Sequence, residues 1–275
     1  MDASNFLKST LNPMKLRTFF VGCILAVTVL LFAHRGHSAA QPSGFSSVVD
    51  LTHAFNTRVP TFEASDESPY QVKTLSTLAK EHYFLRAFCM PEHFGTHLDA
   101  PAHFAQGLWT VDQIPPERLV SPLVVLDVSA NAKANADYQV AVEDIAAWER
   151  VHGEIPPNAV VIANTGWNSR WNSAAAYRNA DAKGVKHFPG YSKEAAKFLV
   201  EGRKVNGLGI DTLSIDNGPS TDFAVHQYTM AHSIYHLENV ANLDHVPASG
   251  AIVVAAPIKL EGGSGGPVRI LALVR

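Results

Sequence analysis

A short histidine-rich segment constrains the fold of this 275-residue chain more than any other feature. His93, His97 and Asp99 lie two or four residues apart, so an extended strand would present all three side chains on one face. Gly95 and Thr96, between the two histidines, disfavour a helix. The segment therefore predicts a strand that carries three potential metal ligands.

Two imidazoles and one carboxylate on one face suit Zn²⁺, Mn²⁺ or Fe²⁺, with coordination positions left open for water. Pro101 stops the strand from continuing, and the resulting turn can bring His103 back over the metal as a base or an acid. A single histidine is usually structural. Three histidines and an aspartate within eleven residues, bracketed by glycine and proline, instead favour a metal site.

A second group consists of His226, His232, His236 and Glu238. On one continuous helix, His226 and Glu238 would lie about 120° apart around the axis. They reach the same ion only if the helix ends and the chain turns before Glu238. Spacing alone leaves two interpretations open: these residues are the polar face of a helix, or they are a further set of metal ligands. It slightly favours the first.

The body of the chain predicts one α/β domain over residues 45–275, in which strands and helices mix without strict alternation. Short apolar runs predict strands at 46–51, 123–128, 160–163, 205–210, 251–255 and 268–274. The glycine-rich stretch 261–267 predicts a flexible connection between the last two. Helical patterns cover 143–151, 192–201 and 221–235, with Ser192 as an N-cap and glycines 153 and 202 as C-terminal stops.

The N-terminal residues 1–40 have the three-part pattern of a secretory signal. Lys15 and Arg17 precede the apolar run 18–33, and Ser38-Ala39-Ala40 offers a cleavage site. An uncleaved anchor is the competing interpretation, although the run is slightly short for a membrane-spanning helix. Both place the folded body outside the cytoplasm, in the periplasm or secreted, and cleavage would leave no stable membrane association.

The net charge of −3 bears on the partner of this protein. A mildly acidic chain without a basic stripe argues against nucleic acid as a partner. We therefore expect a small-molecule partner.

The segment His93-Phe94-Gly95-Thr96-His97-Leu98-Asp99-Ala100-Pro101-Ala102-His103-Phe104 resembles the signature of the cyclase family, which includes bacterial kynurenine formamidases and isatin hydrolases. The resemblance spans about residues 46–275. It continues, in the order of the family, through Asp50-Leu51-Thr52-His53, Asn164-Thr165-Gly166-Trp167, Phe188-Pro189-Gly190, Gly209-Ile210-Asp211-Thr212-Leu213-Ser214-Ile215-Asp216 and Gly266-Pro267-Val268-Arg269.

This resemblance implies a swivelling β/α/β fold with a mixed-strand, barrel-like core and outer helices, assembled as a homodimer or larger homo-oligomer. It implies that the ligands of one or two divalent ions, zinc or manganese, are His93, His97, Asp99, His226 and Glu238. Asp99 would bridge the ions if two bind. His103 would be the catalytic histidine, whereas His232 and His236 receive no support and stay as helix-surface or second-shell residues.

The family also implies hydrolysis of an aryl amide or formamide by metal-activated water, as in an arylformamidase, or of a cyclic amide such as isatin. Export favours an amide or lactam hydrolase outside the cytoplasm, because tryptophan degradation runs inside it. An exported, non-catalytic metal-binding protein is the alternative from another class. The candidates for substrate contacts, each of which could instead be structural, are Phe62, Phe94, Trp109, Trp167 and Ser214.

Overall fold

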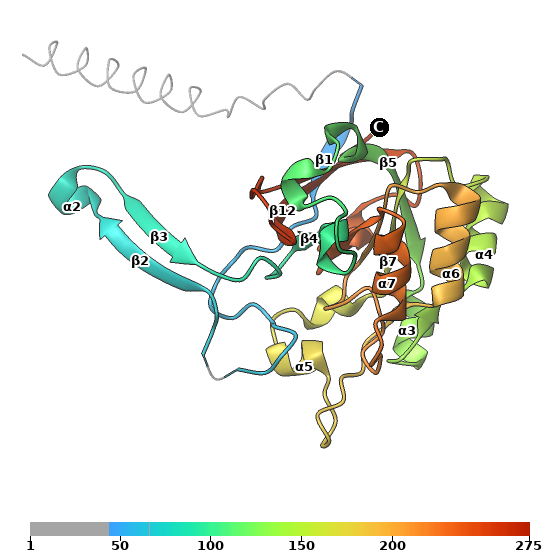
Figure 1. Cartoon of the computed structure of the whole chain (residues 1–275), viewed down its shortest axis with the longest axis horizontal. Coiled ribbons are helices and arrows are strands. Elements are labelled where there is room, and N and C mark those ends of the chain that lie inside the picture. The colour runs from blue at the N-terminus through green and yellow to red at the C-terminus, as the bar shows by residue number, and fades with distance from the viewer. Residues whose placement is uncertain (1–43, 66) are drawn as a thin grey trace, which may run out of the picture. The chain divides into compact units, whose positions relative to one another are not determined.

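A closed barrel of mixed strands forms the centre of the computed structural model, which describes residues 44–65 and 67–275 (Figure 1). Strands β5, β7, β9 and β10 are parallel to one another, whereas β11, β12 and β4 are antiparallel to their neighbours. Pairing of β4 with β12 closes the barrel, and β1 (Ser47–Asp50) adds to β12. The spatial order is β12 (Gly265–Val274), β11 (Ala251–Pro257), β5 (Val120–Asp127), β7 (Val160–Asn164), β9 (Gly207–Ile210), β10 (Tyr235–Glu238) and β4 (His97–Asp99). The predicted α/β fold with a barrel-like core is confirmed.

The barrel strands separate two hydrophobic cores, because successive side chains of a strand point to opposite faces. One core is built from alternate residues all around the barrel, among them Leu98, Leu123, Ile162, Leu237 and Val253. The strand residues between them, such as Val124, Val161 and Leu208, join a second core with helix residues such as Ile145 and Leu199. Strands buried on both faces read as continuous apolar runs, which is why the sequence predicts them well.

Helices α4 (Val142–His152) and α6 (Lys193–Lys197) lie side by side against this second core (Figure 1). The predicted cap is present, because the Ser192 hydroxyl accepts a hydrogen bond from the Ala195 N–H at 3.1 Å. A single π-helical turn, Phe198–Gly202, extends α6 to the predicted glycine stop. Other short elements are α3 (Ser129–Ala134), α5 (Ala174–Arg178) and the small parallel pair β6 (Gln139–Val140) and β8 (Gly190–Tyr191).

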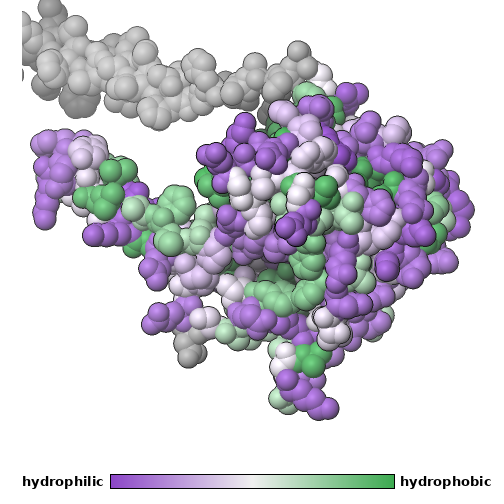
Figure 2. Space-filling view, in the orientation of Figure 1, coloured by the Kyte–Doolittle hydropathy of each residue, from purple (hydrophilic) through white to green (hydrophobic). Residues whose placement is uncertain are grey.

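A hairpin arm, residues 71–89, extends away from the barrel (Figure 1). It consists of β2 (Gln71–Ser76) and β3 (Leu85–Cys89), joined by the short helix α2 (Leu78–Glu81). Apolar side chains are exposed along the arm, as Figure 2 shows. Of the thirteen large hydrophobic residues exposed in the described chain, the arm carries seven: Val72, Leu75, Leu78, Tyr83, Phe84, Leu85 and Phe88.

Two predictions of secondary structure are corrected. The helix expected over 221–235 is only α7 (Ala224–Ala231), because Ser233 adopts φ 59° and the chain then joins the barrel as β10. The stretch 261–267 is not simply a flexible connection, since Gly265–Pro267 already pair with β4. The predicted signal at residues 1–40 lies outside the described residues, and no described helix meets the length and hydropathy of a membrane span.

Candidate metal centre

Two similar tripeptides on neighbouring strands form the floor of the site. His97–Asp99 on β4 and His236–Glu238 on β10 both read histidine, leucine, acid, and they pair antiparallel. Leu98 and Leu237 join the core inside the barrel, so the histidines and acids point to the opposite face. In this register each histidine lies opposite the acidic residue of the other strand.

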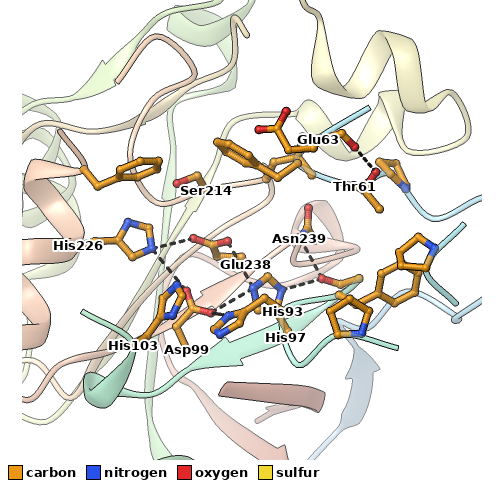
Figure 3. Close-up of a pocket in the computed structure, with 18 of the residues that line it drawn as sticks. Thr61, Glu63, His93, His97, Asp99, His103, Ser214, His226, Glu238 and Asn239 are labelled. Carbon is orange, nitrogen blue, oxygen red and sulfur yellow. Dashed lines mark hydrogen bonds and ion pairs between the residues drawn. The ribbon is translucent and has the colours of Figure 1, made fainter. Parts of the chain in front are cut away.

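Three more histidines reach the site from other elements (Figure 3). His93 precedes β4 in a turn that depends on Gly95, whose φ of +63° suits glycine. His93 therefore does not share a strand with His97, and the prediction of one continuous strand is wrong. His226 comes from α7, and His103 comes from the 3₁₀ turn Pro101–His103 after β4.

The carboxylate of Asp99 lies between two pairs of imidazoles. Its Oδ1 is 2.6 Å from His93 Nδ1 and 3.1 Å from His97 Nε2. Its Oδ2 is 3.5 Å from His226 Nε2 and 3.9 Å from His236 Nδ1. Each oxygen thus faces its own pair of nitrogens.

The carboxylate of Glu238 also lies between these two pairs of imidazoles, close to one histidine of each. Its Oε2 lies 3.5 Å from His97 Nε2, and its Oε1 lies 3.4 Å from His226 Nε2. Oε1 also accepts a hydrogen bond from the Ile215 N–H at 2.9 Å, which fixes the carboxylate. The structure therefore brings together all five predicted ligands, including the two whose spacing alone was ambiguous.

Hydrogen bonds on the far side of the rings select the nitrogen that each histidine presents to the centre. His97 Nδ1 donates to the Gly95 carbonyl at 2.9 Å, and His226 Nδ1 donates to Asp216 at 2.7 Å. These bonds leave Nε2 of both rings facing Asp99. Such outer partners are typical of metal-binding histidines, because they fix the tautomer and orient the ring.

His93 is fixed in the same way by a chain of two hydrogen bonds. The Ser264 hydroxyl donates to Glu92 at 2.7 Å, so it accepts from His93 Nε2 at 2.9 Å. The other ring nitrogen, Nδ1, is hydrogen-bonded to Asp99 Oδ1 at 2.6 Å. Sequence reasoning missed Ser264, because it lies in the glycine-rich stretch that was expected to be a flexible connection.

The pKa values show that this buried centre favours positive charge. Burial acts to lower the pKa of His97, but Asp99 and Glu238 outweigh it and raise the pKa to about 9. Burial likewise opposes protonation of His226, yet hydrogen bonds to Asp216, Asp99 and Glu238 hold its pKa well above the usual value. A divalent cation would supply this charge in place of the protons, so the residues fit a metal ion.

A cavity of about 590 Å³ opens above the centre. Phe62, Phe94 and Ser214 line it, in agreement with their proposed contacts. Trp109 and Trp167 lie elsewhere: Trp109 packs against the barrel core, and Trp167 is buried with its indole N–H on the Tyr177 carbonyl. The sequence analysis missed several other lining residues, which are Pro60, Leu213, Phe104, Phe223 and Asn239.

His103 differs from the other histidines of the site. Its ring stacks on His93 with centroids 4.0 Å apart and lines the cavity. Within the described chain neither of its nitrogens is held by a hydrogen bond, so both are available to a substrate. Burial lowers the pKa of His103 to about 4, which keeps the ring neutral at pH 7.

Comparisons with known proteins agree with this geometry. A family model described as "Putative cyclase" matches residues 49–217. An isatin hydrolase from Roseibium aggregatum is 33% identical over 87% of this chain and 96% of that protein. A kynurenine formamidase from Bacillus cereus is 25% identical over 82% of this chain and 96% of its own length.

Among solved structures, isatin hydrolase A from Ralstonia solanacearum superposes with a TM-score of 0.78 at 37% identity. The match covers 83% of this chain and 92% of that one. The family model and the relative from Roseibium aggregatum each extend over more than half of the present chain. The chain therefore belongs to the cyclase family.

Proposed function

We propose that this protein is a metal-dependent hydrolase that opens the carbon–nitrogen bond of a neutral, planar aryl amide, with a cyclic amide of the isatin type as the favoured substrate. The observation that carries this proposal is the cavity. Its floor is the metal centre, and its walls carry apolar side chains such as Phe62 and Phe94. A planar ring can pack between them while its carbonyl reaches the floor.

The chemistry that a bound divalent ion supplies is a water whose pKa falls from about 15.7 to about 7, together with polarisation of the substrate carbonyl. The protein orients this centre through the anchored imidazoles of His97 and His226. Asp99 and Glu238 are buried, so these carboxylates at the floor have little contact with bulk water.

His103 supplies the proton transfer. Its neutral ring accepts a proton from the attacking water and passes it to the leaving nitrogen. Ser214 supports the other side of the substrate. Its Oγ accepts a hydrogen bond from the Asp216 N–H at 3.3 Å, which leaves its own proton free to donate into the cavity. The position of His103 also favours an enzyme over a non-catalytic metal-binding protein.

Arylformamidase activity is the second candidate, supported by the kynurenine formamidase relatives. N-formylkynurenine carries an α-carboxylate and an α-ammonium group. No lysine or arginine is among the described residues that line the cavity and could pair with the carboxylate. Of the two glutamates that line it, Glu238 belongs to the metal centre and Glu63 is already paired with Lys186 at 2.9 Å. A carboxylate that loses water without a cationic partner pays a large desolvation cost, so the cavity suits the uncharged ring better.

Steady-state kinetics on isatin and N-formylkynurenine test this preference. We expect kcat/KM for isatin to exceed that for N-formylkynurenine by at least about 10-fold, which corresponds to about 1.4 kcal/mol. Chelator-treated protein provides the blank for both substrates. An equal or higher kcat/KM for N-formylkynurenine would show that the cavity does accept the charged amino-acid group.

We further propose that the protein acts outside the cytoplasm as a homodimer and uses zinc or manganese. The apolar run 18–33 after Lys15 and Arg17 supports export. The exposed apolar arm 71–89 supports dimerisation, because an isolated two-stranded hairpin is marginally stable in water. The mixture of imidazole and carboxylate ligands suits both metals.

A further inference from the structure

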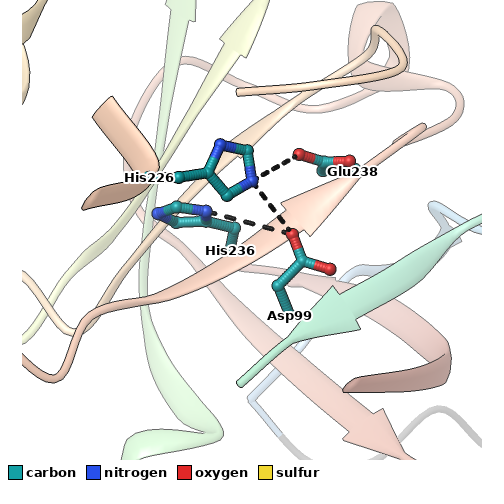
Figure 4. Close-up of side chains that lie close together, drawn as sticks. All are labelled: Asp99, His226, His236 and Glu238. Carbon is teal, nitrogen blue, oxygen red and sulfur yellow. Dashed lines mark ion pairs between the residues drawn. The ribbon is translucent and has the colours of Figure 1, made fainter. Parts of the chain in front are cut away.

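The side chain of His236 does not lie on a helix surface, which was one of the two places expected for it. It lies on β10 and is fully buried at the edge of the metal centre (Figure 4). His232, four residues earlier, does match that expectation, since it is exposed and its Nδ1 donates to the Tyr228 carbonyl at 2.7 Å. The two histidines therefore have different roles.

Hydrogen-bond directions determine which nitrogen of His236 carries the proton. The Thr229 hydroxyl donates to the Val225 carbonyl at 2.7 Å, one turn earlier in α7. Having committed its only proton, this oxygen accepts from His236 Nε2, also at 2.7 Å. His236 Nδ1 is then an unprotonated acceptor.

Nothing in the described chain donates a hydrogen bond to His236 Nδ1, although the atom is buried. A buried polar atom without a partner is rare in native proteins and requires an explanation. The atom points to Asp99 Oδ2, 3.9 Å away, and this oxygen accepts rather than donates. Two acceptors that face each other across such a gap suit a cation between them.

The pairing of β4 and β10 supports the same role. His236 occupies in its tripeptide the position that His97 occupies in the other, opposite the acid of the partner strand. Asp99, His226, His236 and Glu238 each offer an atom within 4.8 Å of the others. His93, His97 and Asp99 form a second such group, and Asp99 belongs to both.

We propose that His236 Nδ1 is a direct metal ligand, which completes a second ion position formed by Asp99, His226, His236 and Glu238. Four protein ligands close a tetrahedral site, whereas three leave a position open. His93, His97 and Asp99 would then hold the ion whose position stays open to water and substrate. This inference rests on the proposed metal-dependent function, but metal binding tests it without any substrate.

The test is titration of the metal-free protein with Zn²⁺, by calorimetry and elemental analysis, in the wild type and three variants. The wild type should bind two ions per chain. His236→Ala should retain one and bind the other at least about 100-fold more weakly, the upper end of what loss of an outer partner costs. Thr229→Val, which keeps His236 but removes the acceptor for Nε2–H together with the bond to the Val225 carbonyl, should weaken binding of the same ion by about 10- to 100-fold.

His232→Ala is the matched control and should bind both ions like the wild type. Circular dichroism of the metal-free proteins checks folding, and if His236→Ala does not fold, Thr229→Val decides the question alone. Unchanged binding of both ions by the folded His236→Ala protein, or by Thr229→Val in its place, would overturn the proposal, with a trapped water as the explanation for Nδ1. Two-ion binding that depends on His236 in a protein that hydrolyses no amide would sustain the inference and refute the proposed function.

Discussion

Replacement of Asp99 by asparagine is expected to remove the bound metal and nearly all activity. Each oxygen of this carboxylate faces a separate pair of imidazoles, so one substitution affects both positions. The amide keeps the shape but loses the negative charge. We expect kcat/KM to fall by at least about 10³-fold, because both water activation and its coupled proton transfer depend on the centre.

Metal content after dialysis and kcat/KM for isatin measure this effect. Asp127→Asn is the matched control, since Asp127 ends β5 at an exposed position and should leave both values unchanged. An Asp99→Asn protein with its full complement of metal would show that Asp99 is not a metal ligand.

His103→Asn is expected to separate catalysis from metal binding. The ring lines the cavity and is neutral at pH 7, so its loss removes the proton carrier and leaves the anchored imidazoles in place. We expect kcat to fall by about 10²-fold or more, the usual scale of general acid–base help, with metal content unchanged.

The comparison protein is His245→Asn, because His245 is an exposed histidine that does not line the cavity. Its kcat and metal content should match those of the wild type. A wild-type kcat for His103→Asn would exclude the proton-transfer role, and loss of metal would instead make His103 a ligand.

The sequence predicted those parts of the fold in which local pattern and burial agree. Strands such as β5 and β7 are apolar on both faces, and helix α4 carries its own stop at Gly153. The arm 71–89 escaped prediction, because both of its faces are exposed and its sequence shows no buried stripe. The strand β10 was not predicted, and the helix predicted over 221–235 ran into its first residue, since its pairing partners β4 and β9 are distant in sequence and override local preference.

The site was predictable from the sequence only for those residues that belong to a specific motif. The ligands His93, His97 and Asp99 lie within seven residues, whereas His226 and Glu238 were inferred only through the family resemblance. His236 was expected only as a helix-surface or second-shell residue, although a signal for its place on a strand was present. The tripeptide His236-Leu237-Glu238 repeats the pattern of His97-Leu98-Asp99, and its alternation favours a strand over a helix.

The central claim is that this protein uses a bound divalent ion to hydrolyse an aryl amide. Ring opening of isatin, followed by absorbance while the metal-free protein is titrated with Zn²⁺ or Mn²⁺, tests it most directly. The account predicts no activity above background without metal and a rise to a plateau as the ions fill the centre. A metal-free protein that opens isatin at the full rate would contradict it.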